Sequence, residues 1–470
     1  MTDGPSPAPS FDPGSFRDPL SRVLVDGDRV LRVVRDAGVA DLDALEGARF
    51  WADAQAAGTV VGTRATSMPA ELAVDGWERA VEHDRIPVIS YPYEWTFSML
   101  RDAALQQLEL TRAALADGLL TKDATPFNTQ FVGAAPVFID VGSFERLPRG
   151  EPWRGYRQFC ESFYNPLLLQ AVRDMPFQPW LRGARSGIGP VECRRLLSGR
   201  QLIGKGAFTN VVLHARLERR HADSRRDVEG ELRQAGYGPK LIDAQLAKLS
   251  KVVQKLEWKA SASTWSDYTD RSHYGERDLQ AKVDFVTSVA AATPRRQIVD
   301  LGTNDGHFAR LVAGHAASVV AVDGDPLVVD RLYRSLRHEG SVDILPLYVD
   351  LLDPSPSLGW RSRERAAFVD RVAPDLTLAL ALVHHLAISG TVPLPEVIEF
   401  LHDLGGEVVV EFPTRDDPMV QRLLDRKRSG LFDHYRLDAF DDAIAGRYEV
   451  VRREVLPSGT RHLFHLAPRR

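Results

Sequence analysis

Acidic residues in the second half of this 470-residue chain follow short apolar runs, and glycines surround the first of them. The residues in this pattern are Asp300, Gly302, Asn304, Gly306, Asp323 and Asp350. Glycines in a turn between a strand and a helix let a nucleotide-like ligand lie against the backbone, because a side chain there would hold it away. A carboxylate at the tip of the next strand, here Asp323, can accept hydrogen bonds from ribose hydroxyls. The carboxylate of Asp350, after the third strand, could meet an adenine amino group. The spacing therefore predicts a site for a nucleotide-like ligand.

A second set of residues could move a proton. His384 and His385 end the apolar run that begins at Asp375, and Glu411 lies near the end of the next one. Ligands of open α/β sheets bind at the carboxyl ends of the strands, so we expect these side chains at the edge of the site. A histidine there can act as a general base toward an acceptor O–H or N–H; alternatively, one histidine packs and the other faces solvent. Glu411 could orient a histidine or bind a cationic acceptor, or it could form a structural ion pair.

The elements that position these residues begin after Trp265. From there, short apolar strands alternate with helical patterns, which is typical of a parallel sheet built from βαβ units. The segment Tyr448–Pro468 contains two strand patterns joined by Pro-Ser-Gly, which predicts a terminal hairpin. We therefore place a domain boundary near residue 260 and predict one domain over 261–470.

The stretch Asp300–Gly306 resembles the first motif of class I S-adenosyl-L-methionine (SAM)-dependent methyltransferases, an acidic residue followed by a Gly-x-Gly-x-Gly turn. Asn304 stands where that motif has its central glycine. The resemblance implies an α/β fold with a Rossmann-like seven-stranded sheet whose last strand is antiparallel. It also implies that SAM is the cofactor, with Gly302–Gly306 facing its methionine part, Asp323 its ribose and Asp350 its adenine.

A nicotinamide-binding Rossmann domain is the competing interpretation. That domain has a Gly-x-Gly-x-x-Gly turn, whereas Gly302 and Gly306 are four positions apart. Dinucleotide-binding folds also usually lack a terminal hairpin, so the methyltransferase is favoured. In this fold the segment before the first strand often closes over the cofactor, which makes Tyr268 and Tyr274 candidates for lining the site. No metal is expected, because sulfonium is already a good leaving group and two adjacent histidines give too few spaced ligands.

The first half of the chain is predicted in three parts. A disordered leader covers 1–20, a mainly helical α+β domain 21–190, and a helical connecting region 191–260. Within the α+β domain, Ser21–Gly47 suggests short helices, and Gly58–Thr63 and Arg85–Pro92 suggest strands or extended segments. Apolar residues at helical spacing predict an amphipathic helix over Phe97–Ala116.

Asp123, Asn128 and Asp140 resemble a set found in protein kinases and related phosphotransferases. Those enzymes have a base aspartate, an asparagine five residues on, and a later aspartate that holds magnesium. The chain departs from them because no lysine precedes Lys122, and Arg64 is the nearest substitute for the strand lysine. Three interpretations stay open: an active phosphotransferase, a kinase-like fold kept for binding, which we favour, or polar turn residues without a ligand. The first two predict a nucleotide and magnesium site at these residues.

Bulk composition limits the partners. A formal net charge of −5 argues against a nucleic-acid partner, because phosphate binding usually requires a basic excess. Two cysteines fit a reducing cytoplasm, and no apolar run approaches the ~20 residues of a membrane span. The high Arg-to-Lys ratio suggests a GC-rich bacterial genome, and the layout resembles bacterial methyltransferases that carry an extra N-terminal region.

These observations predict a cytoplasmic SAM-dependent methyltransferase that acts on a small-molecule acceptor. A kinase-like N-terminal module would bind or present that acceptor. The alternatives are a bifunctional phosphotransferase–methyltransferase, and a non-catalytic binding or scaffold protein that keeps both folds. No sequence feature indicates the oligomeric state or a membrane partner.

Overall fold

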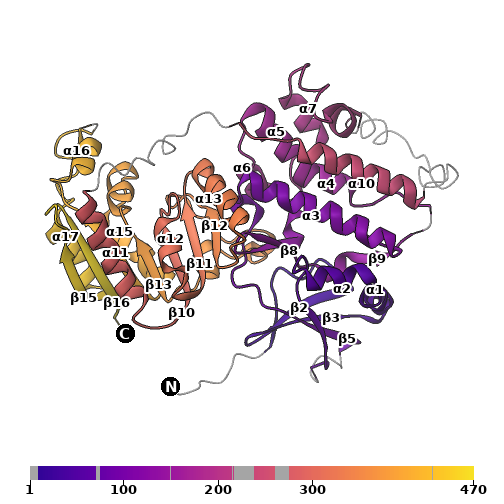
Figure 1. The fold of residues 1–470 in the computed structure, drawn as a ribbon, viewed down its shortest axis with the longest axis horizontal. Coiled ribbons are helices and arrows are strands. Elements are labelled where there is room, and N and C mark those ends of the chain that lie inside the picture. Colours follow the sequence, from indigo (N-terminus) through magenta and orange to yellow (C-terminus); the bar gives the residue numbers. More distant parts are fainter. Residues whose placement is uncertain are drawn as a thin grey trace. The chain divides into compact units, whose positions relative to one another are not determined.

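The chain forms two compact units (Figure 1). The computed structural model describes residues 9–69, 75–148, 150–213, 215, 238–259, 275–425 and 427–469. The first unit consists of Met1–Phe131, Pro136–Ser261 and Gly359–Arg365, and the second of Val132–Ala135, Ala262–Leu358 and Ala366–Arg470. Within the residues described, no helix combines the length and apolar character needed to cross a membrane.

The second unit is built on a seven-stranded sheet with the order β12-β11-β10-β13-β14-β16-β15. Its strands are β10 (Arg295–Leu301), β11 (Ala316–Asp323), β12 (Ile344–Tyr348), β13 (Leu376–Ala379), β14 (Glu407–Pro413), β15 (Tyr448–Val455) and β16 (Arg461–Pro468). The strands β10 to β14 are parallel, and β16 is antiparallel to both of its neighbours. This is the strand order and direction of the class I methyltransferase sheet, so the predicted α/β fold with an antiparallel last strand is confirmed.

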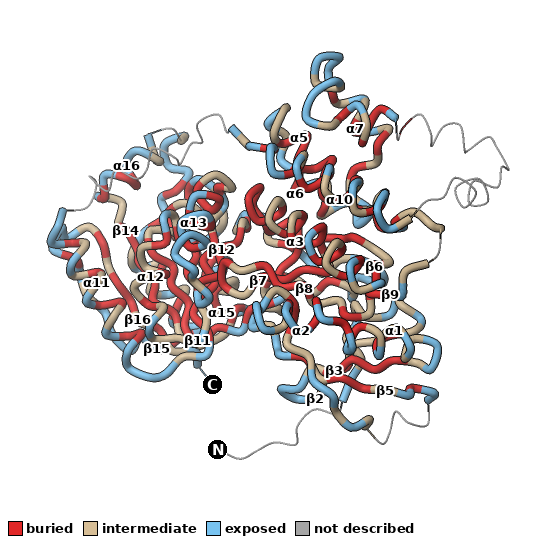
Figure 2. Tube along the Cα trace, turned by 45° about the vertical axis from the view of Figure 1, so that its right-hand side comes forward, coloured by how far each residue is buried: buried red, intermediate tan, exposed pale blue. Residues whose placement is uncertain are grey.

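Helices alternate with these strands along the chain (Figure 1). They are α11 (Glu276–Ala290), α12 (His307–Ala313), α13 (Pro326–Glu339), α14 (Phe368–Arg371), α15 (Leu394–Leu404), α16 (Pro418–Leu424) and α17 (Leu437–Ala445). The central strands are buried along most of their length, as Figure 2 shows for β14, which agrees with their continuous Val- and Leu-rich sequences. Asp325 caps α13 by accepting from the backbone N–H groups of Leu327 and Val328. Strand β15 forms one edge of the sheet and is mostly exposed.

The fourth predicted strand is shorter than the apolar run suggested. It was expected to extend from Asp375 to Leu386 and to end in the two histidines, but β13 ends at Ala379. The chain then turns at Ala381, whose φ is 51°. His384 directly precedes a one-turn π-helix, His385–Ser389. The strand prediction was therefore wrong for the histidines, because apolar residues continue beyond the turn that ends the strand.

The first unit contains a five-stranded antiparallel sheet with the order β1-β2-β3-β5-β4. Its strands are β1 (Ser10–Phe11), β2 (Ser21–Asp26), β3 (Arg29–Val34), β4 (Thr63–Thr66) and β5 (Arg79–His83). The short helices predicted for the start of Ser21–Gly47 were wrong, since β2 and β3 form a hairpin there and only α1 (Asp36–Glu46) is helical. The two-residue turn Gly27-Asp28, with a φ of 57° at Gly27, favours such a hairpin. The Arg85–Pro92 segment forms no strand.

Helices dominate the rest of the first unit. They are α2 (Arg49–Ala56), α3 (Phe97–Ala116), α4 (Tyr156–Phe159), α5 (Asn165–Arg173), α6 (Gln178–Gly183), α7 (Pro190–Leu196) and α10 (Pro239–Gln254). Helix α3 has the predicted bounds, begins after the Thr96 cap and packs beside α10 (Figure 1). After α3, β6 (Leu119–Thr121) pairs with β9 (Phe144–Arg146), and β7 (Thr129–Val132) with β8 (Ala135–Phe138). These short strands flank the predicted Asp123, Asn128 and Asp140.

Candidate active site

The turn between β10 and α12 has left-handed backbone at alternate positions. The φ angles are 74° at Gly302, 50° at Asn304 and 79° at Gly306. Glycine adopts this region freely, and asparagine tolerates it better than most other residues. Asn304 therefore preserves the backbone shape that the central glycine of the motif would give. A Cβ added at Gly306 would lie 2.6 Å from the end of the Leu332 side chain, which would have to shift, and the φ of 79° disfavours any other residue there.

Asp323 connects this turn to the tip of β11. Its Oδ2 accepts the backbone N–H of Asn304 at 3.0 Å, and its Oδ1 accepts the backbone N–H of Asp325 at 2.9 Å. Burial raises the pKa of the Asp323 carboxyl, and these N–H groups oppose that shift. A carboxylate has about four acceptor positions, so two hydrogen bonds leave room for two more donors.

The other two predicted acidic residues differ in burial. Asp300 is buried, and its Oδ2 accepts from the Thr303 hydroxyl at 2.7 Å. Burial raises the pKa of Asp300 to about 6. Asp350 is exposed after β12 and accepts the backbone N–H of Leu352 at 2.9 Å. Asp300 therefore shapes the turn from inside, whereas Asp350 is accessible at the carboxyl end of the sheet.

The two histidines lie against one another, with ring centroids 4.2 Å apart. His384 is buried, and its Nδ1 has no hydrogen-bond partner among the residues that the structure describes. Burial is the main cause that lowers the pKa of His384 well below its ordinary value, and the neighbouring His385 lowers it further. Burial, with the charge of Arg461, lowers the pKa of His385 to about 4. Both imidazoles are therefore neutral near pH 7. The predicted Tyr268 and Tyr274 lie outside the described residues.

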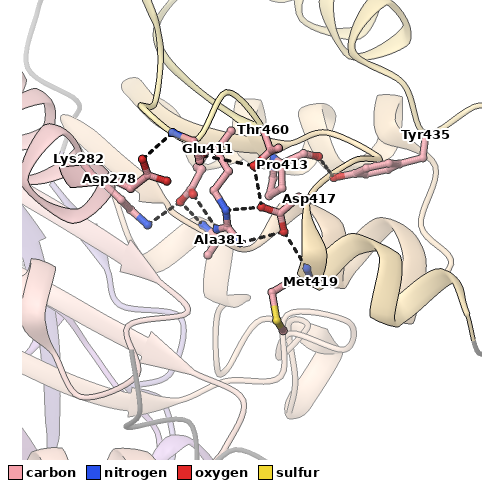
Figure 3. Close-up of polar contacts among 11 residues, drawn as sticks. Asp278, Lys282, Ala381, Glu411, Pro413, Asp417, Met419, Tyr435 and Thr460 are labelled. Atoms are coloured by element: carbon pink, nitrogen blue, oxygen red, sulfur yellow. Dashed lines mark hydrogen bonds and ion pairs between the residues drawn. The ribbon is translucent and has the colours of Figure 1, made fainter. Parts of the chain in front are cut away.

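Glu411 lies in a buried cluster of alternating charges (Figure 3). Its Oε2 is 2.5 Å from the Lys282 ammonium, and its Oε1 is 2.9 Å from Nη1 of Arg461. Arg461 also donates to both oxygens of Asp417, at 2.7 and 3.1 Å. Burial opposes ionisation of Glu411, but the charges of Lys282 and Arg461 outweigh it and lower the pKa of its carboxyl. We call Lys282, Glu411, Asp417 and Arg461 the buried charge cluster.

The buried charge cluster contacts the segment that carries the histidines. Glu411 Oε2 accepts the backbone N–H of Ala381 at 2.9 Å, three residues before His384. The geometry thus gives Glu411 an ion-pair and positioning role, and its direct participation in catalysis stays a prediction. Sequence reasoning missed Lys282 and Arg461, which are 129 and 50 residues away from Glu411.

In the first unit, two of the three predicted residues contact one another. Asp123 Oδ1 accepts from the Asn128 side-chain amide at 2.9 Å and from the Ser143 hydroxyl at 2.5 Å. Asp140 instead pairs with Arg32, at 3.1 Å from Nη1. Burial raises the pKa of Asp140, and the charge of Arg32 opposes that shift.

Arg32 is a buried strand residue that sequence reasoning missed. It lies buried on β3 and donates to the Ser21 hydroxyl at 3.0 Å, whereas Arg64 is exposed on β4 and pairs with Glu82 and Asp84. An arginine within the apolar strand Arg29–Val34 was the available signal. Arg32 also lines a cavity together with Asp18, Ser21, Asp41, Lys122 and Gly142. Across the described ranges, no group of three or more His, Cys, Asp or Glu side chains could hold a metal ion.

Comparison with known proteins gives one relative that covers nearly the whole chain. The nodulation protein NoeA of Rhizobium meliloti (strain 1021) is 33% identical over 463 residues, which cover 98% of this chain and 96% of the relative. No protein-family model matches the chain.

Solved structures match a smaller part of the chain. The N-methyltransferase NodS from Bradyrhizobium japonicum WM9 is 14% identical, with 43% of this chain and 99% of NodS covered and a TM-score of 0.31. A SAM dependent methyltransferase from Aquifex aeolicus is 12% identical, with 44% of this chain and 98% of that chain covered and a TM-score of 0.30. The fold assignment rests on the strand order of the second unit itself.

Proposed function

The chain belongs to the family of the nodulation protein NoeA, and we propose that it is a SAM-dependent methyltransferase acting on a small-molecule acceptor in the bacterial cytoplasm. One observation supports this most strongly: the carboxylate of Asp323 accepts a hydrogen bond from the backbone of Asn304, in a turn whose residues 302, 304 and 306 all have left-handed backbone. That arrangement joins a backbone surface suited to a nucleotide-like ligand with an acceptor for ribose hydroxyls.

The residues present fit SAM, which when bound supplies a methyl group activated by its sulfonium. The Gly302–Gly306 turn would face the methionine part. The two acceptor positions left on Asp323 would take the ribose hydroxyls, and the exposed Asp350 would take the adenine amino group. A Cβ added at Gly302 would meet the Leu382 side chain at 3.6 Å, so this stretch of backbone is approachable.

The histidines provide a proton acceptor on the same edge of the sheet. A neutral imidazole can take a proton at its unprotonated nitrogen, and burial keeps His384 and His385 neutral. In this proposal His384 accepts the proton of the acceptor O–H or N–H. The buried charge cluster holds the turn before it through the bond from Ala381 to Glu411.

The test is calorimetric titration of the purified full-length protein with SAM and with its demethylated product, S-adenosylhomocysteine. Micromolar binding of both supports the proposal and justifies a search for the acceptor with labelled methyl groups. A folded protein that binds neither compound would contradict it and would favour the scaffold alternative.

For the first unit, we propose a kinase-like module that binds a nucleotide. The observation in its favour is the pair of Arg32 with Asp140 beside the cavity that Lys122 and Gly142 also line. An arginine on a strand and an aspartate after β8 are suited to phosphate and magnesium, respectively.

This second proposal predicts magnesium-dependent ATP binding that is lost in Asp140→Asn. Exposed Asp28, in the turn of the β2–β3 hairpin, offers a matched control, and Asp28→Asn should bind ATP as the wild type does. A folded wild type that does not bind ATP would leave Asp123, Asn128 and Asp140 as structural polar residues.

A further inference from the structure

Arg365 is a buried cation without an acidic partner. It lies in the segment Gly359–Arg365 of the first unit and is 7% exposed. Its Nε and Nη1 are buried and have no hydrogen-bond partner, and within the described residues Arg365 forms no ion pair. Its guanidinium carbon lies 5.8 Å from the ring centroid of Tyr93 and 5.5 Å from that of Phe127.

This environment is costly for a guanidinium. Arginine stays protonated in proteins, so it cannot escape burial by losing its charge. The two aromatic rings attract the cation, but they do not replace the hydrogen bonds that its N–H groups make in water. A buried unpaired charge of this kind calls for an external acceptor.

The segment that carries Arg365 is held firmly. Glu364 receives two hydrogen bonds from Arg17, at 2.6 and 2.8 Å, and one from the backbone N–H of Trp360 at 3.0 Å. Arg17 lowers the pKa of the Glu364 carboxyl to about 2, so this pair stays charged. Arg361 and Ser362 have φ angles of 56° and 52°, a strained backbone for these residue types. The guanidinium is thus presented from a fixed support.

The surroundings of Arg365 suit a small molecule rather than a bare ion. The Tyr91 ring lies 5.4 Å from that of Tyr93 and 6.4 Å from that of Phe127, which gives an apolar, aromatic wall. Phe127 directly precedes Asn128, whose side chain binds Asp123. Along the chain, Phe127 therefore connects this aromatic wall to a hydrogen-bonded carboxylate.

We propose that Arg365 is the anion receptor of a ligand site on the first unit. Its Nε and Nη1 donate to an oxyanion, a phosphate or a carboxylate, of a small molecule whose remainder lies near the Tyr91, Tyr93 and Phe127 side chains. The proposal does not depend on SAM binding or on methyl transfer, because it rests on residues of the first unit alone.

The experiment measures anion binding by the full-length protein at constant ionic strength, with sodium chloride as the balancing salt. The probes are inorganic phosphate, followed by phosphorus NMR line broadening, and acetate, followed by its competition with phosphate and by thermal unfolding. The variants are Arg365→Met and, as the matched control, Arg363→Met, an exposed arginine of the same segment. We expect at least tenfold weaker binding in Arg365→Met and wild-type binding in Arg363→Met.

Stability separates a binding role from a structural one. If Arg365 serves to bind an anion, its buried charge does not stabilise the protein when no anion is present. In the absence of anion, Arg365→Met should therefore unfold at the wild-type temperature or above it. Phosphate or acetate should raise the unfolding temperature of the wild type but not that of the variant. If Arg365→Met does not fold, Arg365→Lys serves instead, and its single ammonium should bind the anion more weakly than the guanidinium.

Preference for one probe identifies the ligand group: phosphate alone indicates a phosphorylated ligand, and equal or better binding of acetate indicates a carboxylate. Either outcome supports the site. The proposal would be overturned if the wild type bound neither phosphate nor acetate. Equal binding by the wild type and the Arg365 variants would overturn it as well.

Discussion

Glu411 on β14 accepts the backbone N–H of Ala381 at 2.9 Å while the same oxygen is paired with Lys282. A single carboxylate therefore fixes both α11 and the turn that leads to His384. Because Ala381 has a φ of 51°, an unfavourable region for alanine, this turn needs such support. The stability of the buried charge cluster and the placement of the histidines are thus linked.

Neutralising Glu411 should destabilise the protein strongly. Glu411→Gln keeps the shape of the side chain but leaves Lys282 and Arg461 with less compensation, which we expect to lower the free energy of unfolding by about 3–5 kcal/mol. Urea unfolding provides the measurement. The double variant Glu411→Gln/Lys282→Met should recover part of the loss. Glu399→Gln, which breaks the exposed pair with Arg447, should have a much smaller effect on unfolding because solvent screens that pair. Equal losses in the buried and exposed variants would contradict the assignment.

Removing the charge of Asp323 should weaken SAM binding. Asp323→Asn loses an acceptor for the ribose hydroxyls, and we expect a Kd about 10 to 100 times higher, or ~1.4–2.7 kcal/mol. Titration calorimetry measures the change, and circular dichroism verifies the fold. The exposed Asp343 is the control position. If Asp323→Asn bound SAM like wild type, the ribose assignment would be wrong.

Asn304 should tolerate glycine and reject a β-branched residue. Asn304→Gly retains access to a φ of 50° and should preserve SAM affinity. Asn304→Val places a branched side chain in the left-handed region, which costs about 1–3 kcal/mol. Urea unfolding of the two variants distinguishes them. A valine variant as stable as the glycine variant would show that the turn is not held in this conformation.

Replacing His384 should affect turnover rather than cofactor affinity. His384→Gln removes the proposed proton acceptor, and general bases typically contribute about 10²–10⁴-fold to rate. Once the acceptor is known, labelled-methyl transfer gives the rate and calorimetry gives the Kd for SAM. The exposed His338, replaced by glutamine, is the control. Unchanged turnover in His384→Gln would place the base elsewhere or leave positioning as the source of catalysis.

The stability of the wild type should depend on the neutral state of His385. Its folded pKa is about 4 against 6.5 in the unfolded chain, so the unfolded state binds the proton first as the pH falls. The stabilisation is complete above about pH 6.5 and is lost toward pH 4, by about 3 kcal/mol from 1.4 kcal/mol per pKa unit. The difference in unfolding free energy between wild type and His385→Asn should therefore be about 3 kcal/mol smaller at pH 4 than at pH 7. A constant difference between the two proteins would argue against a buried neutral imidazole.

Sequence reasoning predicted the sheet of the second unit well because local pattern specifies it. Buried parallel strands are continuous apolar runs, and the Pro-Ser-Gly turn marks the terminal hairpin. The same logic failed where apolar residues continue beyond a turn, as between Ala379 and His384. In the first unit it failed for Ser21–Val34, where β-branched residues and a Gly-Asp turn favour a hairpin over helices.

Partners distant in sequence could not be predicted. Lys282, Glu411 and Arg461 come from a helix and two strands that only the folded sheet brings together. Arg32 and Asp140 likewise meet through tertiary structure, and the sequence had pointed to Arg64 instead, which is exposed and pairs with Asp84. Local spacing thus indicates the turn around Asn304 and Asp323, whereas the charged supports behind it depend on the topology.

Strand β15, at the border of the seven-stranded sheet, leaves one row of backbone groups without a neighbouring strand in that sheet. Its exposed Val450, Val451 and Val455 would favour pairing with another molecule. Two features of the strand oppose this. Its register shifts between Val450 and Arg452, and Arg452 pairs with Glu454 on the strand itself. Both an irregular backbone and charged side chains are features that disfavour edge-to-edge pairing of strands.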